Sequence, residues 1–186
     1  MNKYRAKHFF TLIELLLVVA IIAILIGIVM PSTMQVKGKS IKSACMSNLR
    51  QIGIALNMYA DENNERYPYC TMKPSDPPTT PADKSEANMP GIAPTLLPYL
   101  KDKKVFLCPG DINETYYRAE GVSYEWQSSL YNGWNVAKKQ RVEELFKDLP
   151  KLPVMFDFDN FHGKSGSKTA KNFLYPYGNV SGEMLP

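Results

Sequence analysis

An uninterrupted apolar segment near the start of the chain constrains its fold more than any other feature. From Leu15 to Met30 no side chain is polar, and the segment reaches about 20 residues when it is extended back to Phe10. A helix of that length rises about 1.5 Å per residue and crosses the hydrocarbon core of a bilayer. A secretory signal peptide has a shorter apolar core, of about 7 to 15 residues, and a small-x-small cleavage site. The sequence therefore predicts a transmembrane helix over residues 10–30 after a basic leader over residues 1–9.

Glu14 is an ionisable residue inside this apolar segment. An ionised carboxylate at the centre of a bilayer costs about 2.5 to 3.5 kcal/mol on insertion scales, so it requires either a partner or a function. The alternative explanation is that the Glu14 carboxylate lies one turn from the membrane interface and is solvated by lipid headgroups.

The residues around Glu14 carry a specific resemblance. The run Phe10-Thr11-Leu12-Ile13-Glu14-Leu15-Leu16, after a basic leader and before a long apolar stretch, resembles the prepilin signature of type IV pilins and type II secretion pseudopilins. The resemblance implies that prepilin peptidase cleaves before Phe10 and methylates its new amino group. It also implies that Glu14, then the fifth residue, supports assembly of subunits. Phe9 stands where the family usually has glycine, which leaves Phe9 open as an alternative mature start.

Beyond the apolar segment, residues 31–62 show the spacing of an amphipathic helix. Apolar residues recur at intervals of three and four, with polar residues between them, and Pro31 can bend a helix without ending it. The sequence predicts one helix that continues from the transmembrane half and ends near Asp61 to Asn64. The apolar positions of the second half are Ile41, Cys45, Leu49, Ile52, Leu56 and Tyr59.

Residues 63–186 are predicted to form a small α+β globular domain with a proline-rich loop over residues 73–94. The predicted fold class is α+β: a long N-terminal α-helix, half transmembrane and half amphipathic, packed on a small antiparallel β-sheet as in pilins. Strands are predicted at 105–107, 121–127, 152–157 and 172–175, with a return through Gly178 to Val180, and short helices at 95–100 and 141–149.

The resemblance extends past the signature. Residues 43–61, 106–109 and 162–180 are similar to pilin-like proteins that are numerous in planctomycetes and lentisphaerae. Members of that group tend to end in a histidine, a spacer and an Asp-Gly turn before a final strand. This chain has His162 and Gly178 but has Tyr177 in place of the aspartate.

The three cysteines allow one disulfide, in three possible pairings, and none of them forms a C-x-x-C pair. A periplasmic domain would permit such a bond. Cys108, in a Leu-Cys-Pro turn, is the favoured participant, and its partner is either Cys70 or Cys45. We prefer Cys45 because its helical position faces the predicted domain.

Asp157 and Asp159, in the run MFDFDNFHG, are the candidate metal ligands. Oxygen ligands at alternating positions suit Ca²⁺, the one cofactor considered, although the full EF-hand pattern is absent. Polar residues at a strand end are the commoner explanation. A catalytic pair of Asp157 with His162 is the less favoured interpretation, because no serine elbow or paired-histidine motif accompanies it.

The sequence thus favours a structural subunit of a type IV pilus or a type II secretion pseudopilus. It is not expected to be an enzyme. The resemblance implies a single-pass protein of the bacterial inner membrane, whose C-terminal domain is periplasmic or lies in an extracellular filament. The implied partners are prepilin peptidase, like subunits and inner-membrane lipid. Nucleic acid is not expected, since three of the 22 basic residues lie in the leader and the other 19 nearly balance 18 acidic ones.

Two alternatives belong to other classes. In the first, the prepilin signal serves only for export of a surface binding protein, whose aromatic-rich stretches at 116–117, 124–126 and 131–134 bind glycans. The same aromatic residues also suit the core of a small domain, and we favour that explanation. In the second alternative, an enzyme is tethered to the membrane by the apolar segment.

Overall fold

The computed structural model describes residues 11–71, 89–138 and 152–185, and the chain divides into two units, Met1–Lys39 and Ser40–Pro186. Helix α1 (Leu12–Glu62) contributes to both units. Its first part carries exposed apolar side chains, and its second part lies in the C-terminal unit. Within the described residues, no helix is both long enough and apolar enough to cross a membrane. The proline-rich loop falls mostly outside the described residues, as does the predicted helix 141–149.

The second half of α1 has the amphipathic face that its sequence predicts. Cys45, Leu49 and Ile52 are fully buried, whereas Ile54 on another face is 55 % exposed. A helix in this position is stabilised chiefly by packing of its apolar face, because isolated helices are marginal in water.

The end of α1 is also where the sequence predicts it. Glu65 N–H donates to the carbonyl of Ala60 at 2.8 Å, and the Asn63 side chain donates to the carbonyl of Tyr59 at 2.8 Å. Asn64 and Glu65 adopt positive φ angles of 56° and 58°, which turn the chain away from the helix.

A four-stranded antiparallel sheet packs against this half of α1. Its strands are β1 (Tyr124–Trp126), β2 (Met155–Asp157), β3 (Phe173–Leu174) and β4 (Val180–Ser181), and they lie in chain order. Each strand falls inside or directly beside a segment that the sequence predicts as a strand. The observed class is therefore α+β.

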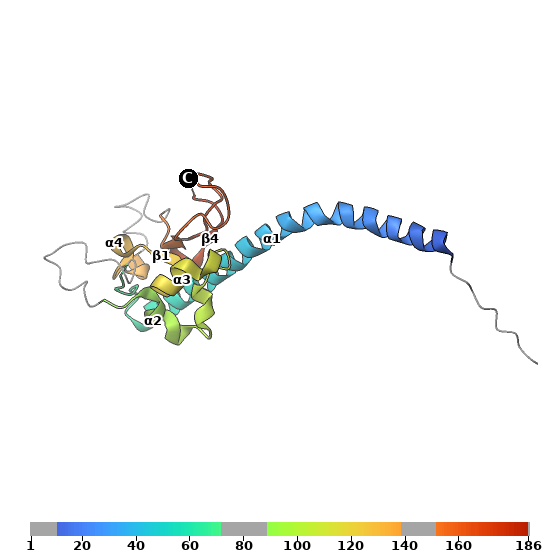
Figure 1. The fold of residues 1–186 in the computed structure, drawn as a ribbon. Coiled ribbons are helices and arrows are strands. Elements are labelled where there is room, and N and C mark those ends of the chain that lie inside the picture. Colours follow the sequence, from blue (N-terminus) through green and yellow to red (C-terminus); the bar gives the residue numbers. More distant parts are fainter. Residues whose placement is uncertain (1–10, 72–88, 139–151, 186) are drawn as a thin grey trace, which may run out of the picture. The chain divides into compact units, whose positions relative to one another are not determined.

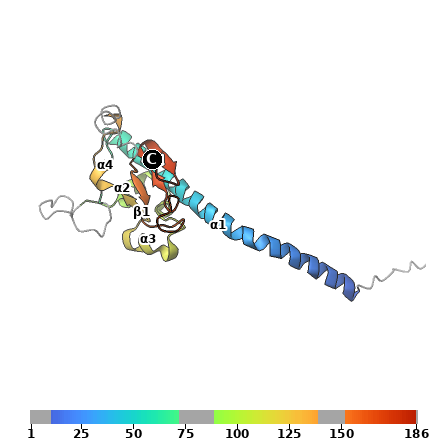
Figure 2. The same ribbon diagram turned by 90° about the horizontal axis from the view of Figure 1, so that it is seen from above.

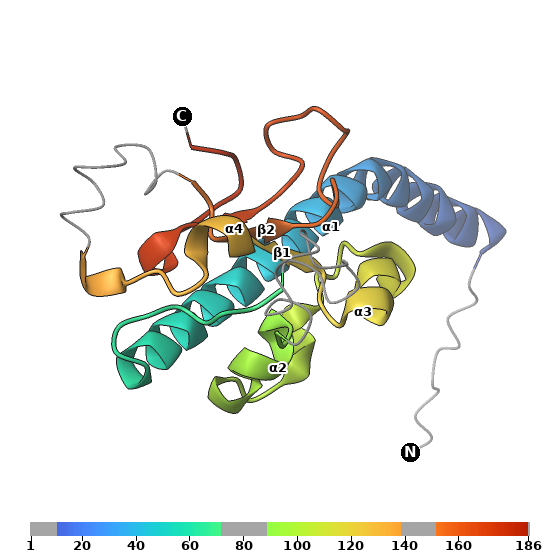
Figure 3. The same cartoon turned by 90° about the vertical axis from the view of Figure 1, so that its left-hand side faces the viewer.

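Short helices complete the C-terminal unit. In Figures 1 and 2, and most clearly in Figure 3, they gather with the strands around the second half of α1. The α-helices are α2 (Ile92–Leu96), α3 (Thr115–Glu120) and α4 (Ser128–Tyr131), and the 3-10 helices are η2 (Leu97–Tyr99), η3 (Lys103–Phe106), η4 (Ile112–Glu114), η5 (Val136–Lys138) and η7 (Pro176–Gly178).

The strand predicted at 105–107 is wrong, because η3 occupies most of this segment. The side chain of Asp102 accepts a hydrogen bond from Lys104 N–H at 2.9 Å and caps the turn. A capping interaction of this kind offers the backbone an alternative to a sheet, even where Val-Phe-Leu favours a strand. The predicted helix 95–100 is shifted: α2 begins at Ile92, and η2 follows it to Tyr99.

The core of the C-terminal unit lies between α1 and the sheet. Its largest fully buried side chains are aromatic, which confirms the core interpretation for Tyr124, Trp126 and Tyr131. Gly53 of α1 allows the helix to approach the sheet closely. A Cβ atom at this position would lie 2.9 Å from Leu174 Cδ1 and 3.1 Å from Gly178 Cα.

Candidate functional site

A disulfide joins Cys45 of α1 to Cys108, which follows η3. Their Cα atoms lie 5.1 Å apart, and both residues are fully buried. This is the pairing that the sequence analysis prefers. The two residues are separated by 63 positions, and closing a loop of that size stabilises a fold by about 4 kcal/mol in the chain-entropy description.

The turn that carries Cys108 is held by a buried carboxylate. Asp111 N–H donates to the carbonyl of Cys108 at 2.9 Å. The Asp111 side chain, 5 % exposed, accepts hydrogen bonds from the Ser123 hydroxyl at 2.8 Å and from Tyr117 N–H at 2.9 Å. Gly110 lies so close to the next loop that a Cβ atom there would be 2.9 Å from Phe161 Cβ. The turn is therefore fixed against the segment that carries His162.

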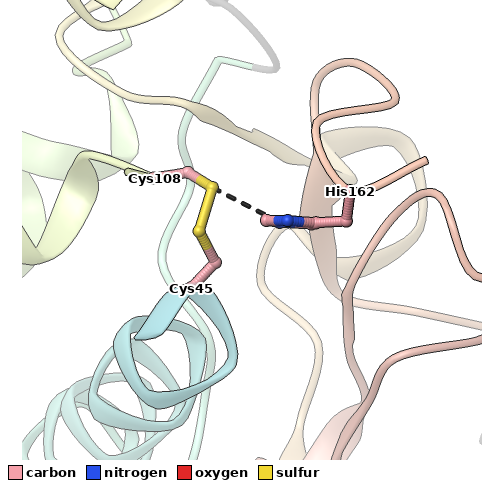
Figure 4. Close-up of side chains that lie close together, drawn as sticks. All are labelled: Cys45, Cys108 and His162. Carbon is pink, nitrogen blue, oxygen red and sulfur yellow. Dashed lines mark hydrogen bonds between the residues drawn. A yellow bond between two sulfur atoms is a disulfide. The ribbon is translucent and has the colours of Figure 1, made fainter. Parts of the chain in front are cut away.

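His162 lies beside the disulfide. Its side chain is 1 % exposed, and its Nε2 atom is 3.5 Å from Cys108 Sγ. Figure 4 shows the imidazole ring directed at the disulfide. The backbone N–H of His162 donates to the carbonyl of Ala170 at 3.0 Å, which fixes the loop between β2 and β3. Three segments far apart in the sequence thus meet at one buried point.

Asp157, the last residue of β2, completes this cluster. Its Oδ2 atom lies 3.3 Å from His162 Nε2 and accepts a hydrogen bond from Asn172 N–H at 2.7 Å. The side chain is fully buried, and this burial raises the pKa of the Asp157 carboxyl, while the contact with His162 opposes the rise. Asp157 and His162 are thus a buried acid and base in contact, without access to solvent.

Several buried polar atoms around this cluster have no hydrogen-bond partner in the described part of the chain. They are Asp157 Oδ1, His162 Nδ1 and both polar side-chain atoms of Asn172. A buried polar atom without a partner costs about 1 to 3 kcal/mol, so such atoms usually contact a water molecule or a ligand. Four of them around one pair of residues mark an incomplete polar site.

Among the described residues, Cys45 Sγ, Cys108 Sγ and His162 Nε2 form a group of potential metal ligands that lie within 4.8 Å of one another. While the disulfide is intact, its sulfur atoms are not thiolates and do not serve as metal ligands. The oxidised cluster is therefore a structural bridge with a buried Asp-His pair beside it.

The two aspartates that the sequence offers for calcium have different surroundings. Asp157 is buried against His162, whereas Asp159 is exposed and accepts hydrogen bonds from the Tyr116 hydroxyl at 3.1 Å and from Asn160 N–H at 2.7 Å. The bond from Asn160 lowers the pKa of Asp159. Calcium binding by this pair stays a prediction. The structure instead brings Asp157 to His162, a pair that the sequence offered only as the less favoured interpretation, and it places His162 beside the disulfide, which the sequence did not indicate.

Glu14 lies in the first turn of α1 and contacts Thr11. Both the backbone N–H and the hydroxyl of Thr11 donate to Glu14 Oε2 at 2.9 Å, and Glu14 N–H donates to the Thr11 hydroxyl at 3.3 Å. This reciprocal arrangement is a capping box, written in the sequence as Thr-x-x-Glu, a signal that the sequence analysis did not use. Phe9 and Phe10, which the resemblance implies as the processing residues, lie outside the described residues.

A concave region lies at the end of α1. A cavity of about 240 Å³ is lined by residues of the last turns of α1, by Val136 and by Tyr177. Its volume is below the range of about 300 to 1,000 Å³ that is typical of small-molecule sites.

Comparison with known protein families, with curated proteins and with solved structures finds no match to this chain.

Proposed function

We propose that this chain is a structural subunit, a pilin or pseudopilin, that assembles through the first half of α1 into a type IV pilus or a secretion pseudopilus. The observation that carries the proposal is the exposed apolar surface of that half. The large apolar side chains from Leu12 to Ile28 are between 46 % and 87 % exposed, the least exposed being Val18 and the most exposed Leu12.

A helix that is apolar on all sides must be covered by something apolar, because such a surface associates or aggregates in water. Before assembly the cover is the lipid of the inner membrane. After assembly it is the corresponding helices of neighbouring subunits. The prepilin-like run from Phe10 to Leu16 supports neighbouring subunits, and not an unrelated protein, as the cover of this apolar surface. It places the recognition signal of a processing enzyme directly before that surface.

Glu14 supports the same assignment. In the single chain its carboxylate is held by Thr11. After cleavage before Phe10, the new amino group of an adjacent subunit competes for this carboxylate. Pairing with a positive amine is the favourable outcome for a carboxylate in an apolar environment. Because helix packing in lipid has no hydrophobic drive of its own, one such pair can set the axial stagger between subunits.

The C-terminal unit is the part displayed outside the membrane in this proposal. It has its own core of buried aromatic and aliphatic residues, and a disulfide joins its helix to its loops. A disulfide of this kind suits an oxidising compartment such as the periplasm. Prepilin peptidase and like subunits are the proposed partners.

Cross-linking through the helix tests the proposal. Ile22, 48 % exposed, is replaced by cysteine in the full-length protein in its membrane, and an oxidant is added. The expected result is covalent dimers and, with a second cysteine at Leu15, a ladder of higher oligomers. Lys101→Cys, on the exposed surface of the C-terminal unit, is the matched control. A helix cysteine that gives monomer only, at any oxidant concentration, would contradict the proposal.

A further inference from the structure

The cluster of Cys45, Cys108, Asp157 and His162 contains two ionisable side chains that a structural disulfide does not require. Its four residues come from α1, the turn after η3, the end of β2 and the following loop. A disulfide in a core needs only apolar neighbours. Here an imidazole that is 1 % exposed is directed at the disulfide (Figure 4), and the fully buried carboxylate of Asp157 contacts that imidazole.

Two of the distances between these atoms, both from His162 Nε2, match those in a tetrahedral zinc site. With Zn–S bonds of about 2.3 Å, Zn–N bonds of about 2.0 Å and Zn–O bonds of about 2.0 to 2.2 Å, adjacent sulfur and nitrogen ligands lie about 3.5 Å apart, and adjacent nitrogen and oxygen ligands about 3.3 Å apart. His162 Nε2 lies 3.5 Å from Cys108 Sγ and 3.3 Å from Asp157 Oδ2. Cys45 Sγ, Cys108 Sγ and His162 Nε2 lie within 4.8 Å of one another, and the two sulfur atoms must separate to about 3.8 Å by the same geometry.

The unpartnered polar atoms are an independent indication of a ligand. Asp157 Oδ1, His162 Nδ1 and the Asn172 amide are buried around the proposed ligand atoms without hydrogen bonds in the described residues.

We propose that, once the Cys45–Cys108 bond is reduced, Cys45, Cys108, His162 and Asp157 bind a zinc-like divalent cation. A dithiol reductant supplies two electrons and two protons, the S–S bond breaks to give two thiols, and the reductant becomes a disulfide. The cation then binds both sulfur atoms as thiolates, and their two protons pass to solvent. Because the disulfide and the metal use the same sulfur atoms, each state excludes the other. The reduced chain thus holds its helix to its loops with a cation, as the oxidised chain does with a covalent bond.

The test uses the full-length protein in detergent, reduced with a dithiol that is then removed in the absence of oxygen. Co²⁺ is the probe, because a tetrahedral thiolate site gives it a charge-transfer band and visible d–d bands. We expect one equivalent of Co²⁺ per reduced chain, displaced by Zn²⁺, and none in the oxidised chain. Loss of an outer-shell group alone typically costs 10- to 100-fold in metal affinity, so His162→Gln, which removes a ligand, should weaken binding at least tenfold. Cys70→Ser, which changes the third cysteine, is the control and should bind as the parent does.

A second measurement keeps the proposal testable if a variant fails to fold. In the reduced parent chain, Zn²⁺ should slow alkylation of Cys45 and Cys108 at least tenfold, as read by peptide mass spectrometry, and leave Cys70 unchanged. The proposal is overturned if the reduced chain binds no Co²⁺, if His162→Gln binds as tightly as the parent, or if Zn²⁺ gives no protection. A reduced chain that unfolds and does not refold with Zn²⁺ also overturns it.

Discussion

Glu14 has two possible partners, and they differ in what they require of its side chain. In the single chain it accepts hydrogen bonds from Thr11, a role that a glutamine also fills in capping boxes. In the proposed filament it pairs with an amino group, which requires a negative charge. Substitutions at this one residue therefore separate helix capping from assembly.

Glu14→Gln and Glu14→Ala are expected to have different effects on the helix and the same effect on assembly. Glutamine keeps the capping interaction, while alanine removes it and so lowers the stability of the first turn of the helix. Neither variant carries the charge, so both should insert into the membrane and both should lose filaments. The measurement is filament yield after shearing of cells, compared with the amount of subunit in the membrane. Parental filament yield from Glu14→Gln would show that the charge has no role in assembly.

Cys70 is the cysteine outside the disulfide, and it is buried. Burial raises the pKa of the Cys70 thiol to about 11, so little thiolate is available near pH 8. We expect iodoacetamide to leave the native protein unlabelled, to label one cysteine per chain after denaturation, and to label three after denaturation with reductant. Peptide mass spectrometry identifies the positions. Labelling of Cys45 or Cys108 without reductant, or rapid labelling of Cys70 in the native chain, would contradict this assignment.

The same shift in pKa has a consequence for stability. The folded state holds the proton of the Cys70 thiol more tightly than the unfolded chain does. The contribution of this proton to the free energy of unfolding is therefore fully present below the pKa of Cys70 in the unfolded chain. It is lost as the pH rises through the folded value, about 11. The free energy of unfolding should therefore fall with rising pH over the alkaline range up to about pH 11.

At the scale of the elements, the contact between α1 and the sheet depends on Gly53. The space beside Gly53 is filled by Leu174 of β3 and by Gly178, whereas Gly38 in the same helix has nothing within 4 Å of an added Cβ. Glycine in a helix interior costs about 1 kcal/mol relative to alanine, so its presence at position 53 needs a packing reason. Two glycines in one helix thus have opposite surroundings.

Gly53→Leu should lower the stability of the C-terminal unit, because a larger side chain forces α1 and β3 apart, at a typical cost of about 1 to 3 kcal/mol. Gly38→Leu is the matched control and should leave the unfolding midpoint unchanged or raise it, since it improves helix propensity in open space. Thermal unfolding of the full-length protein by circular dichroism measures both. Equal midpoints for the two variants would show that the close approach at Gly53 contributes nothing.

The helix and the strands were predictable from sequence because each has a local signal. The spacing of Cys45, Leu49 and Ile52 predicts the buried face of α1, and alternating aromatic residues predict β1. The 3-10 helix from Lys103 to Phe106 was not predictable from strand propensity alone. The Asp102 side chain caps this helix by accepting a hydrogen bond from Lys104 N–H. The Thr-x-x-Glu pattern of Thr11 and Glu14 is a local signal that predicts the observed start of α1.

The cluster around the disulfide had only a partial signal. Helical phase favoured Cys45 as the partner of Cys108, but three cysteines left three pairings open. The position of His162 depends on the loop after β2 and on the close approach of Gly110 to Phe161, and both are properties of the folded chain. Sequence spacing contains no information about a contact across 54 residues.

At the scale of the whole molecule, the two units have different surfaces. The C-terminal unit has a core of fully buried large side chains, while the first half of α1 leaves its large apolar side chains exposed. Among the described residues, the buried hydrophobic cluster lies in the C-terminal unit. The proposed subunit role gives the exposed half its cover, first lipid and then other copies.

Mass spectrometry of the mature N-terminus, carried out on protein sheared from the cell surface, tests this account most directly. The account predicts a filament fraction whose chain begins at Phe10 with a methylated amino group. A chain beginning at Phe9 would keep the subunit role but shift Glu14 to the sixth position. A chain that retains the leader from Met1, is found only in the membrane and is absent from the sheared fraction would contradict the account and indicate a plain signal-anchor protein.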